Sequence, residues 1–282
     1  MSIEEIEKIV GKKHNDRIIW NGEENLHRAR IALHYCKLLK IQLLLHSEQG
    51  YPELLRQICD PPYLLFCKGD ISVLTQGKSV SVVGTRRVTM EGKSAALKFA
   101  YEAAKNGCNV VSGLANGVDG LAHQGVINAY FDELENGNET SNLGKTIAVL
   151  PSGIDEIIPA NHKRLAQQIL QIGGLLISEY EPKMNMANWH FVGRNRIIAG
   201  LSPATVVIEA PAGSGALITA AFALENNRDV MFHQAAFGKQ AVQLADYAFK
   251  ELEKAHAVGK ISKYKMENCP QKFIEAGAPI IK

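Results

Sequence analysis

The sequence lacks the motifs that most directly assign a chain to a class of nucleotide-binding enzymes. It contains neither the G-x-x-x-x-G-K-[ST] motif of P-loop proteins nor the G-x-G-x-x-G fingerprint of dinucleotide-binding folds. Its five cysteines include no C-x-x-C pair, which argues against a zinc site or a disulfide framework. Such cysteine usage is typical of a reducing cytoplasm, where we expect this protein.

Two further absences concern membranes and charge. No apolar run is long enough to span a bilayer, and the first residues are acidic and amphipathic, unlike a signal peptide, so we expect no membrane association. The 282 residues carry 31 Lys and Arg against 29 Asp and Glu, a net charge of only +2. A nucleic-acid partner would therefore have to bind a local basic patch, because no basic field covers the whole protein.

Two short β-branched runs, each followed by a glycine turn and a helical pattern, organise the chain. Residues 80–83 end at Gly84, and residues 109–112 end at Gly113. A glycine turn lets the backbone approach a ligand closely, and the helix that follows offers unpaired N–H groups at the positive end of its dipole. This pattern predicts an anion site, usually one for phosphate.

Beyond residue 80 the sequence alternates between strand and helix patterns. The expected strands are 80–83, 109–112, 146–150, 174–178, 204–209 and 229–232, with helices at about 89–106, 117–130, 161–172, 193–201 and 214–227. Near-continuous apolar strands alternating with helices indicate a mostly parallel sheet covered on both faces. Right-handed crossovers then give an α/β, Rossmann-like, doubly wound fold.

The sequence predicts a small helical extension before this fold. We expect residues 1–70 to form an N-terminal helical extension and connector, and residues 71–282 to form the Rossmann-like domain. Helical spacing of apolar residues is seen through residues 1–50. A pair of prolines then stops a short helix and favours an edge-like strand over residues 63–67.

Near its C-terminal end the chain loses the alternation of strands and helices. Residues 240–257 have the pattern of a helix with mixed acidic and basic residues. Residues 269–282 are expected to form one short helix and a final strand over 278–281.

Residues that directly follow the strands are expected to share one site, because ligands of doubly wound folds bind at the carboxyl ends of the strands. These residues are small, glycine-rich and cationic, with few carboxylates, which favours phosphates. We expect no metal, no cofactor and no catalytic residue. The predicted nucleic-acid and phosphate-binding residues are Gly84, Thr85, Arg86, Gly113, Asn116, Gly117, Asn161, Lys163, Arg194, Asn195, Arg196, Gly213 and Ser214.

Three side chains near the carboxyl ends of the strands suggest catalysis but also have a structural interpretation. Asp119 and His123 are four residues apart on one helical face, as in an acid–base or metal pair, but no third ligand has usable spacing. We expect Asp119 to support the helix N-terminus and His123 to be half-buried. Ser214 can cap a helix or contact an anion, and no histidine base for a serine nucleophile is evident.

The segment around residues 189–196 keeps two interpretations. Arg194 and Arg196, two apart on a helix, point in different directions, so one is expected to face the ligand and the other to form an internal ion pair. Arg194 is favoured for the ligand. The preceding aromatic residues, Trp189 and Phe191, either stack on bases of single-stranded nucleic acid or anchor the loop in the core.

Taken together, these motifs resemble the DNA-processing protein A family (DprA, also called Smf). The resemblance covers roughly residues 51–230. It is carried by VVGTRR (82–87), VVSGLANGVDGLAH (110–123), TIAVLPSGIDEIIPANHKRL (146–165), GLLISEY (174–180), FVGRNRIIAGLS (191–202) and SGALITAAFALE (214–225).

This resemblance implies a non-catalytic protein of the bacterial cytoplasm that binds single-stranded DNA. It implies protection of incoming DNA during natural transformation, help in loading the RecA recombinase, and a homodimer. By position, the family's DNA-contacting arginine corresponds to Arg86, and its basic residue after the third strand corresponds to Lys163; Arg194 and Arg196 line the same pocket. The chain departs from the family where MFHQAAFGKQ replaces a proline–glycine turn and a helical insertion precedes CPQKFIEAGAPII.

Two alternatives use the same pocket. Rossmann-like phosphoribohydrolases similar to the cytokinin-activating LOG proteins cleave nucleoside monophosphates and carry P-G-G-x-G-T-x-x-E. Here the corresponding stretch is PAGSGALIT, with Ile218 and Thr219 where the catalytic glutamate falls, and Glu209 is at the wrong offset. A small-nucleotide sensor is the other alternative.

Overall fold

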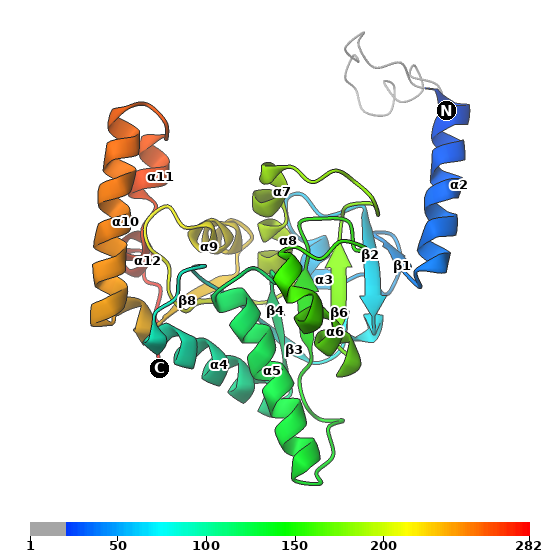
Figure 1. Cartoon of the computed structure of the whole chain (residues 1–282), viewed down its shortest axis with the longest axis horizontal. Coiled ribbons are helices and arrows are strands. Elements are labelled where there is room, and N and C mark those ends of the chain that lie inside the picture. Colours follow the sequence, from blue (N-terminus) through cyan, green and yellow to red (C-terminus); the bar gives the residue numbers. More distant parts are fainter. Residues whose placement is uncertain (1–20) are drawn as a thin grey trace. The chain divides into compact units, whose positions relative to one another are not determined.

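The structure is a computed structural model that describes residues 21–282, and it divides into two compact units, residues 1–42 and residues 43–282 (Figure 1). The described part of the first unit contains helix α2 (Gly22–Leu38). Asn21 caps this helix, because its side-chain oxygen accepts a hydrogen bond of 3.2 Å from the amide of Glu24. The helical pattern predicted over the first twenty residues lies outside the described residues.

The described residues form one nine-stranded sheet of order β1-β2-β6-β5-β4-β3-β7-β8-β9. From β6 to β9 every neighbouring pair is parallel, and β2 is antiparallel to β6. This confirms the mostly parallel, Rossmann-like α/β fold. The strands are β1 (Gln42–Leu45), β2 (Leu64–Gly69), β3 (Lys78–Val83), β4 (Cys108–Ser112), β5 (Thr146–Val149), β6 (Leu175–Ser178), β7 (Ala204–Val207), β8 (Asp229–His233) and β9 (Ile280–Ile281).

The strand order creates a switch point between β3 and β7. The chain runs outward from β3 through β4 and β5 to β6, and then returns to β7 on the other side of β3. At the carboxyl ends of this pair, Val83 lies opposite Val207. Connections leave these two strands in opposite directions, so the sheet is open to a ligand at this point.

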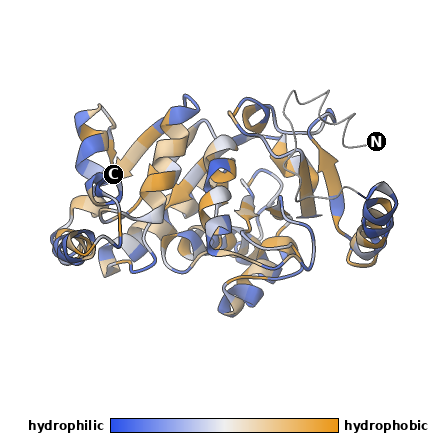
Figure 2. Ribbon diagram, turned by 90° about the horizontal axis from the view of Figure 1, so that it is seen from above, coloured by the Kyte–Doolittle hydropathy of each residue, from blue (hydrophilic) through white to orange (hydrophobic). Residues whose placement is uncertain are grey.

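Helices cover both faces of the sheet. Helices α4, α5 and α6 contact strands β3 to β6 on one face, and α8 and α9 join the hydrophobic core of the other (Figures 1 and 2). The predicted helices are confirmed, except that the one expected over residues 193–201 is the shorter helix α8, and a separate helix, α7, ends directly before Arg194. The second unit contains α3 (Glu53–Arg56), α4 (Met90–Lys105), α5 (Val118–Glu135), α6 (Lys163–Gln171), α7 (Asn188–Gly193), α8 (Asn195–Gly200), α9 (Gly215–Glu225), α10 (Lys239–Ala257), α11 (Lys263–Glu267) and α12 (Pro270–Glu275).

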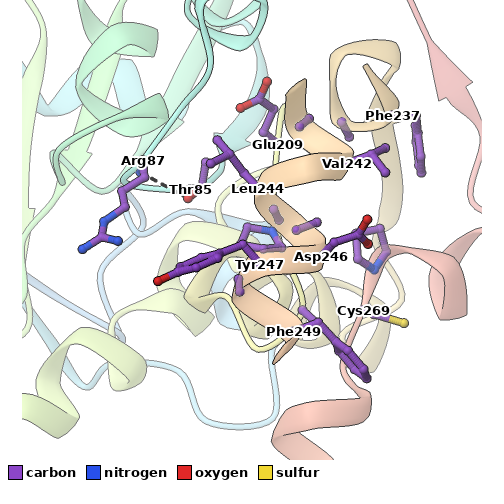
Figure 3. Close-up of a pocket in the computed structure, with 18 of the residues that line it drawn as sticks. Thr85, Arg87, Glu209, Phe237, Val242, Leu244, Asp246, Tyr247, Phe249 and Cys269 are labelled. Atoms are coloured by element: carbon purple, nitrogen blue, oxygen red, sulfur yellow. Dashed lines mark hydrogen bonds between the residues drawn. The ribbon is translucent and has the colours of Figure 1, made fainter. Parts of the chain in front are cut away.

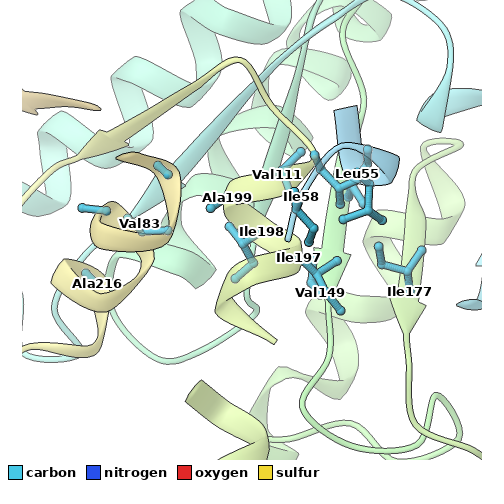
Figure 4. Packing of buried hydrophobic residues seen from close by; sticks show 14 of the residues in the cluster. Leu55, Ile58, Val83, Val111, Val149, Ile177, Ile197, Ile198, Ala199 and Ala216 are labelled. Atoms are coloured by element: carbon cyan, nitrogen blue, oxygen red, sulfur yellow. The ribbon is translucent and has the colours of Figure 1, made fainter. Parts of the chain in front are cut away.

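Alternate residues of the central strands build the core beneath α8 and α9. Val83, Val111 and Val149 project from three neighbouring strands into one buried cluster with Ile197 and Ile198 of α8 (Figure 4). All five side chains are buried. The rigid packing of α8 on the strands fixes where the loops at the carboxyl ends emerge.

Two details of the sheet differ from the sequence-based expectations. The strand predicted over residues 63–67 forms as β2, but it is not at an edge, because β6 pairs with it on one side and β1 lies on the other. Strand β1 falls in a stretch expected to be helical; its four residues, QLLL, are too few for periodicity to separate a strand from a helix. The domain boundary expected after residue 70 stays a prediction.

Close packing of α4 on α5 provides a test of the fold. A Cβ added at Gly125 of α5 would lie 2.5 Å from the backbone oxygen of Leu97 and 2.9 Å from Cβ of Ala100. In an unpacked helix, replacing glycine by alanine stabilises by about 0.5–1 kcal/mol. Here we expect Gly125→Ala to destabilise by about 1–3 kcal/mol in urea unfolding, because α4 must move.

The matched control is Asn128→Ala, an exposed position on the same helix. It should change the free energy of unfolding by no more than about 0.5 kcal/mol. A higher melting temperature for Gly125→Ala than for the unaltered protein would contradict the observed helix contact.

Candidate nucleic-acid interface

A cavity of about 400 Å³ lies at the carboxyl ends of β3 and β7, at the switch point of the sheet. The loop after β3, the loop after β7 and the start of α8 form its walls. We call it the switch-point cavity. Seven of the predicted site residues line it, namely Gly84, Thr85, Arg86, Arg194, Asn195, Gly213 and Ser214.

Backbone contacts join the loop after β3 to its neighbours. The amide of Thr85 donates a 2.7 Å hydrogen bond to the carbonyl of Glu209, and the carbonyl of Thr85 accepts one of 3.2 Å from the amide of Val118. Gly117 has a φ of +84°, and a Cβ added there would lie 2.7 Å from Cα of Arg86. Only glycine permits both this conformation and this approach.

Arg86 and Arg87 bring exposed positive charge to the switch-point cavity. The guanidinium carbon of Arg86 lies 5.0 Å from the centre of the Phe191 ring, a cation–π contact. Neither arginine forms an ion pair with any residue that the structure describes. Arg87 was not among the predicted site residues, although it follows Arg86 directly in the sequence.

Arg194 is buried in the cavity wall, with only 5% of its side chain exposed. Its Nη1 donates hydrogen bonds to the carbonyl of Gly113 and, at 2.5 Å, to the carbonyl of Val149. Its Nη2 lies 3.6 Å from a carboxylate oxygen of Asp119. Arg194 therefore ties the junction of α7 and α8 to the ends of β4 and β5, and its contact with a ligand stays a prediction.

Arg196 forms the internal ion pair that the sequence assigned to one of the two arginines. Its guanidinium lies 2.7 Å from a carboxylate oxygen of Glu179 and 2.9 Å from one of Asp60. These partners raise the pKa of Arg196 against the opposing effect of burial. Arg196 is not among the residues that line the switch-point cavity.

Asp119 is the carboxylate partner of Arg194 in the cavity wall. Burial raises the pKa of Asp119, whereas the charge of Arg194 and hydrogen bonds from the backbone of Ala115 and Gly113 oppose that rise. Burial likewise lowers the pKa of Arg194, and Asp119 opposes this. Asp119 thus links the first turn of α5 to the junction of α7 and α8 through Arg194, whereas its predicted support of the α5 N-terminus stays a prediction.

His123 is fully buried, not half-buried as expected, and does not line the cavity. Its Nδ1 lies 2.6 Å from the hydroxyl of Thr146, which itself donates to the carbonyl of Val110. The hydroxyl proton is thus engaged, so Nδ1 is the donor of the pair. Burial and the nearby charges of His162 and Arg194 lower the pKa of His123 to about 3, so the ring is neutral near pH 7.

Four of the predicted residues, Arg86, Asn116, Asn161 and Lys163, lie in or beside the cavity on exposed segments, and we call them the rim. The side-chain amide of Asn161 donates a 3.1 Å hydrogen bond to the side-chain oxygen of Asn116. Nδ1 of His162 lies 2.8 Å from the carbonyl oxygen of Leu114. Lys163, the next residue, is exposed and lies outside the switch-point cavity, beside a smaller pocket of about 280 Å³. These contacts join the loop after β4 to the segment that leads to Lys163.

The loop after β7 is fixed by its own cap and by the C-terminal segment. The hydroxyl of Ser214 accepts a 3.3 Å hydrogen bond from the amide of Ala216, which confirms its capping role on α9. Gly213, with a φ of +68°, donates its amide to the carbonyl of Asn268 at 2.8 Å. The amide of Gly213 is therefore already hydrogen-bonded within the protein. The loop itself still lines the switch-point cavity.

Metal-ligand clusters and membrane-spanning helices are both absent from the described residues. Within residues 21–282, no three His, Cys, Asp or Glu side chains gather as a metal site would require. In the same range, no helix combines the length and apolar character that a bilayer crossing needs.

The buried Arg194–Asp119 pair makes a pH-dependent prediction. Arg194→Met leaves Asp119 buried without its cation, so the pKa of Asp119 rises further above its value in the unfolded chain. A carboxyl with a raised folded pKa stabilises when it is protonated, so this variant should lose stability as pH rises from the unfolded to the folded pKa. Near neutral pH we expect a loss of about 3–5 kcal/mol in urea unfolding.

The control is the double variant Arg194→Met with Asp119→Asn. It removes the titrating group and should flatten the pH dependence between about pH 4 and about pH 8. If Arg194→Met were equally stable at both ends of this range, the buried pair would not have the assigned role.

Comparison with known proteins gives a family for this fold and cavity. Residues 42–270 match the family described as DNA recombination-mediator protein A. The chain is 39% identical to the DNA processing protein DprA of Bacillus subtilis over 184 residues, which cover 65% of this chain and 57% of that protein. It is 35% identical to the protein Smf of Borreliella burgdorferi over 218 residues, covering 76% of this chain and 64% of that protein. The chain thus spans less than two thirds of either relative.

Two solved structures share the architecture. DNA processing protein A of Streptococcus pneumoniae aligns with a TM-score of 0.66 at 30% identity, over 99% of this chain and 88% of that one. The Helicobacter pylori protein, whose structure concerns a single-stranded DNA binding mode, aligns with a TM-score of 0.60 at 29% identity, over 84% of this chain and 94% of that one. The resemblance read from the motifs is confirmed, and the chain belongs to the DNA recombination-mediator protein A family.

Proposed function

We propose that this chain binds single-stranded DNA along the rim from the switch-point cavity to Lys163, without reacting with it. The observation that carries the proposal is the pair of exposed arginines, Arg86 and Arg87, which follow β3 and have no ion-pair partner among residues 21–282. The single-stranded DNA binding mode of the Helicobacter pylori relative supports it.

The division of labour along the rim follows from exposure. Arg86 and Lys163 are exposed cations, suited to phosphates of one strand. Arg194 is fully engaged inside the wall, so we assign it to shaping the cavity. Trp189, on α7, is 62% exposed and offers an aromatic face to bases, and Phe191 of the same helix lines the cavity. Binding through the DNA phosphates, with only loose stacking of the bases, predicts little sequence preference.

The enzyme alternative needs a free carboxylate, and Glu209 is not free. Glu209 is buried, and its carboxylate accepts a 3.0 Å hydrogen bond from the amide of Thr89 and a 2.5 Å one from its hydroxyl. Thr89 is the N-cap of α4, so Glu209 anchors that helix. Together with the absence of a glutamate at Thr219, this favours binding over cleavage.

The wider role follows from the family. We propose that the chain acts in the bacterial cytoplasm on DNA taken up during natural transformation, protects it, and assists RecA loading as a homodimer. A small-nucleotide sensor is the competing role for the same cavity. Competition of free nucleotides against a bound oligonucleotide distinguishes the two.

Binding by the rim predicts a strong dependence on salt. Fluorescence anisotropy with oligo-dT should show affinity falling steeply with salt concentration, and weaker binding to duplex DNA of equal length. Arg86→Ala with Lys163→Ala should weaken binding to oligo-dT by roughly tenfold or more, and should reduce the slope of log K against log salt by about 1.4, since each single-strand phosphate contact adds about 0.7.

A matched control makes the same charge change at the amino ends of the strands, opposite the proposed site. Lys78 begins β3, and Lys145 directly precedes β5, whereas Arg86 and Lys163 follow those two strands. Lys78→Ala with Lys145→Ala should retain the affinity and the salt slope. Equal losses in both double variants would mean that total charge, and not the rim, holds DNA.

The proposed role in binding predicts no glycosidic cleavage. Incubation of the protein with each of the common nucleoside monophosphates, followed by chromatography, should yield no free base above the protein-free control. Release of a base that is abolished in a Glu209→Gln variant would favour the phosphoribohydrolase alternative instead.

A further inference from the structure

A second cavity, of about 360 Å³, adjoins the switch-point cavity. We call it the α10 cavity, because α10 forms its outer wall (Figure 3). Four residues line both cavities: Thr85, Arg87, Pro211 and Ala212. Arg87 therefore borders both cavities, so a ligand whose phosphate is held at Arg87 can also contact the residues of the α10 cavity.

Helix α10 belongs to the insertion that departs from the family pattern. The insertion is fixed to the loop after β7, because Asn268 accepts the amide of Gly213 and a Cβ added at Gly213 would lie 3.0 Å from a methyl group of Leu252. The position of α10 is thus coupled to the loop that lines the switch-point cavity.

The side of α10 that faces the cavity leaves large apolar groups exposed. Leu244 is 48% exposed and Tyr247 is 65% exposed, although both line the α10 cavity. Figure 3 shows Leu244 beside Thr85, with Tyr247 extending toward the same side as Arg87. A cation, a hydroxyl, an aliphatic group and an aromatic ring thus line the same cavity.

We propose that α10 adds a nucleobase-binding surface to the DNA site. The base of a nucleotide whose phosphate is held at Arg86 and Arg87 stacks on Tyr247 and packs against Leu244. This inference rests on the proposed DNA-binding function. A nucleobase is the occupant that fits, because the surface is apolar and aromatic and is continuous, through Thr85 and Arg87, with a cationic cavity suited to phosphate.

The test compares two oligomers that share phosphates and differ in bases. One is oligo-dT, and the other is an abasic oligomer of equal length. Tyr247→Ala should weaken binding to oligo-dT by roughly fivefold or more and leave binding to the abasic oligomer unchanged, since only a base can stack on the ring. Tyr247→Phe, which keeps the ring, should bind both as the unaltered protein does.

Tyr264 supplies the matched control. It is 69% exposed on α11 but does not line the α10 cavity, so Tyr264→Ala should leave both affinities unchanged. Because Tyr247 is on the surface, its variants should melt at the same temperature as the unaltered protein. An oligonucleotide carrying 5-iododeoxyuridine should crosslink to Tyr247 under ultraviolet light.

The outcomes separate this inference from the function on which it rests. If the unaltered protein bound neither oligomer, both proposals would fail. If it bound oligo-dT and Tyr247→Ala bound it equally well, or weakened both oligomers alike, the base surface on α10 would be overturned while DNA binding by the rim stood.

Discussion

The geometry of the interface depends on one buried guanidinium. Arg194 joins the ends of β4 and β5 through two carbonyl oxygens and the first turn of α5 through Asp119. A buried charge of this kind is costly unless it is fully paired, so its partners must all be in place together. This requirement sets the positions of three loops at once, and with them the wall against which a polyanion would lie.

The exposed charges can then act separately from the buried ones. Arg86 and Arg87 stand free of ion pairs within the described chain, whereas Arg194 and Arg196 are engaged by Asp119 and by Glu179. The same residue type thus serves as scaffold at buried positions and, in the proposed function, as contact at exposed ones. Burial separates the two uses, since all four arginines follow a glycine by three residues or fewer in the sequence.

Much of the fold could be predicted from the sequence, because its signals are local. Buried β-branched runs and the glycines after them marked β3 and β4, and the rule for strand ends placed Gly84 and Ser214 at one cavity. The predictions that failed concerned short elements and contacts between distant parts of the sequence. Strand β1 is too brief for periodicity, and one neighbour of β2, strand β6, is more than a hundred residues away in the sequence.

The partners of individual side chains were harder still to predict. Nothing in the spacing of Arg194 and Arg196 distinguishes a guanidinium that meets two carbonyl oxygens from one that meets two carboxylates. Arg87 was passed over because its position at the junction of two cavities depends on α10, more than 150 residues later. Such residues are found by geometry and not by pattern.

The hydrogen bond from Gly213 to Asn268 has a consequence for the order of assembly. The loop after β7 gains its final support from a segment made more than fifty residues later. A chain still emerging from the ribosome can therefore complete the sheet through β8 while this loop remains unsupported. The loop after β7 therefore acquires its last contact only after Asn268 has been made, when all the strands through β8 already exist.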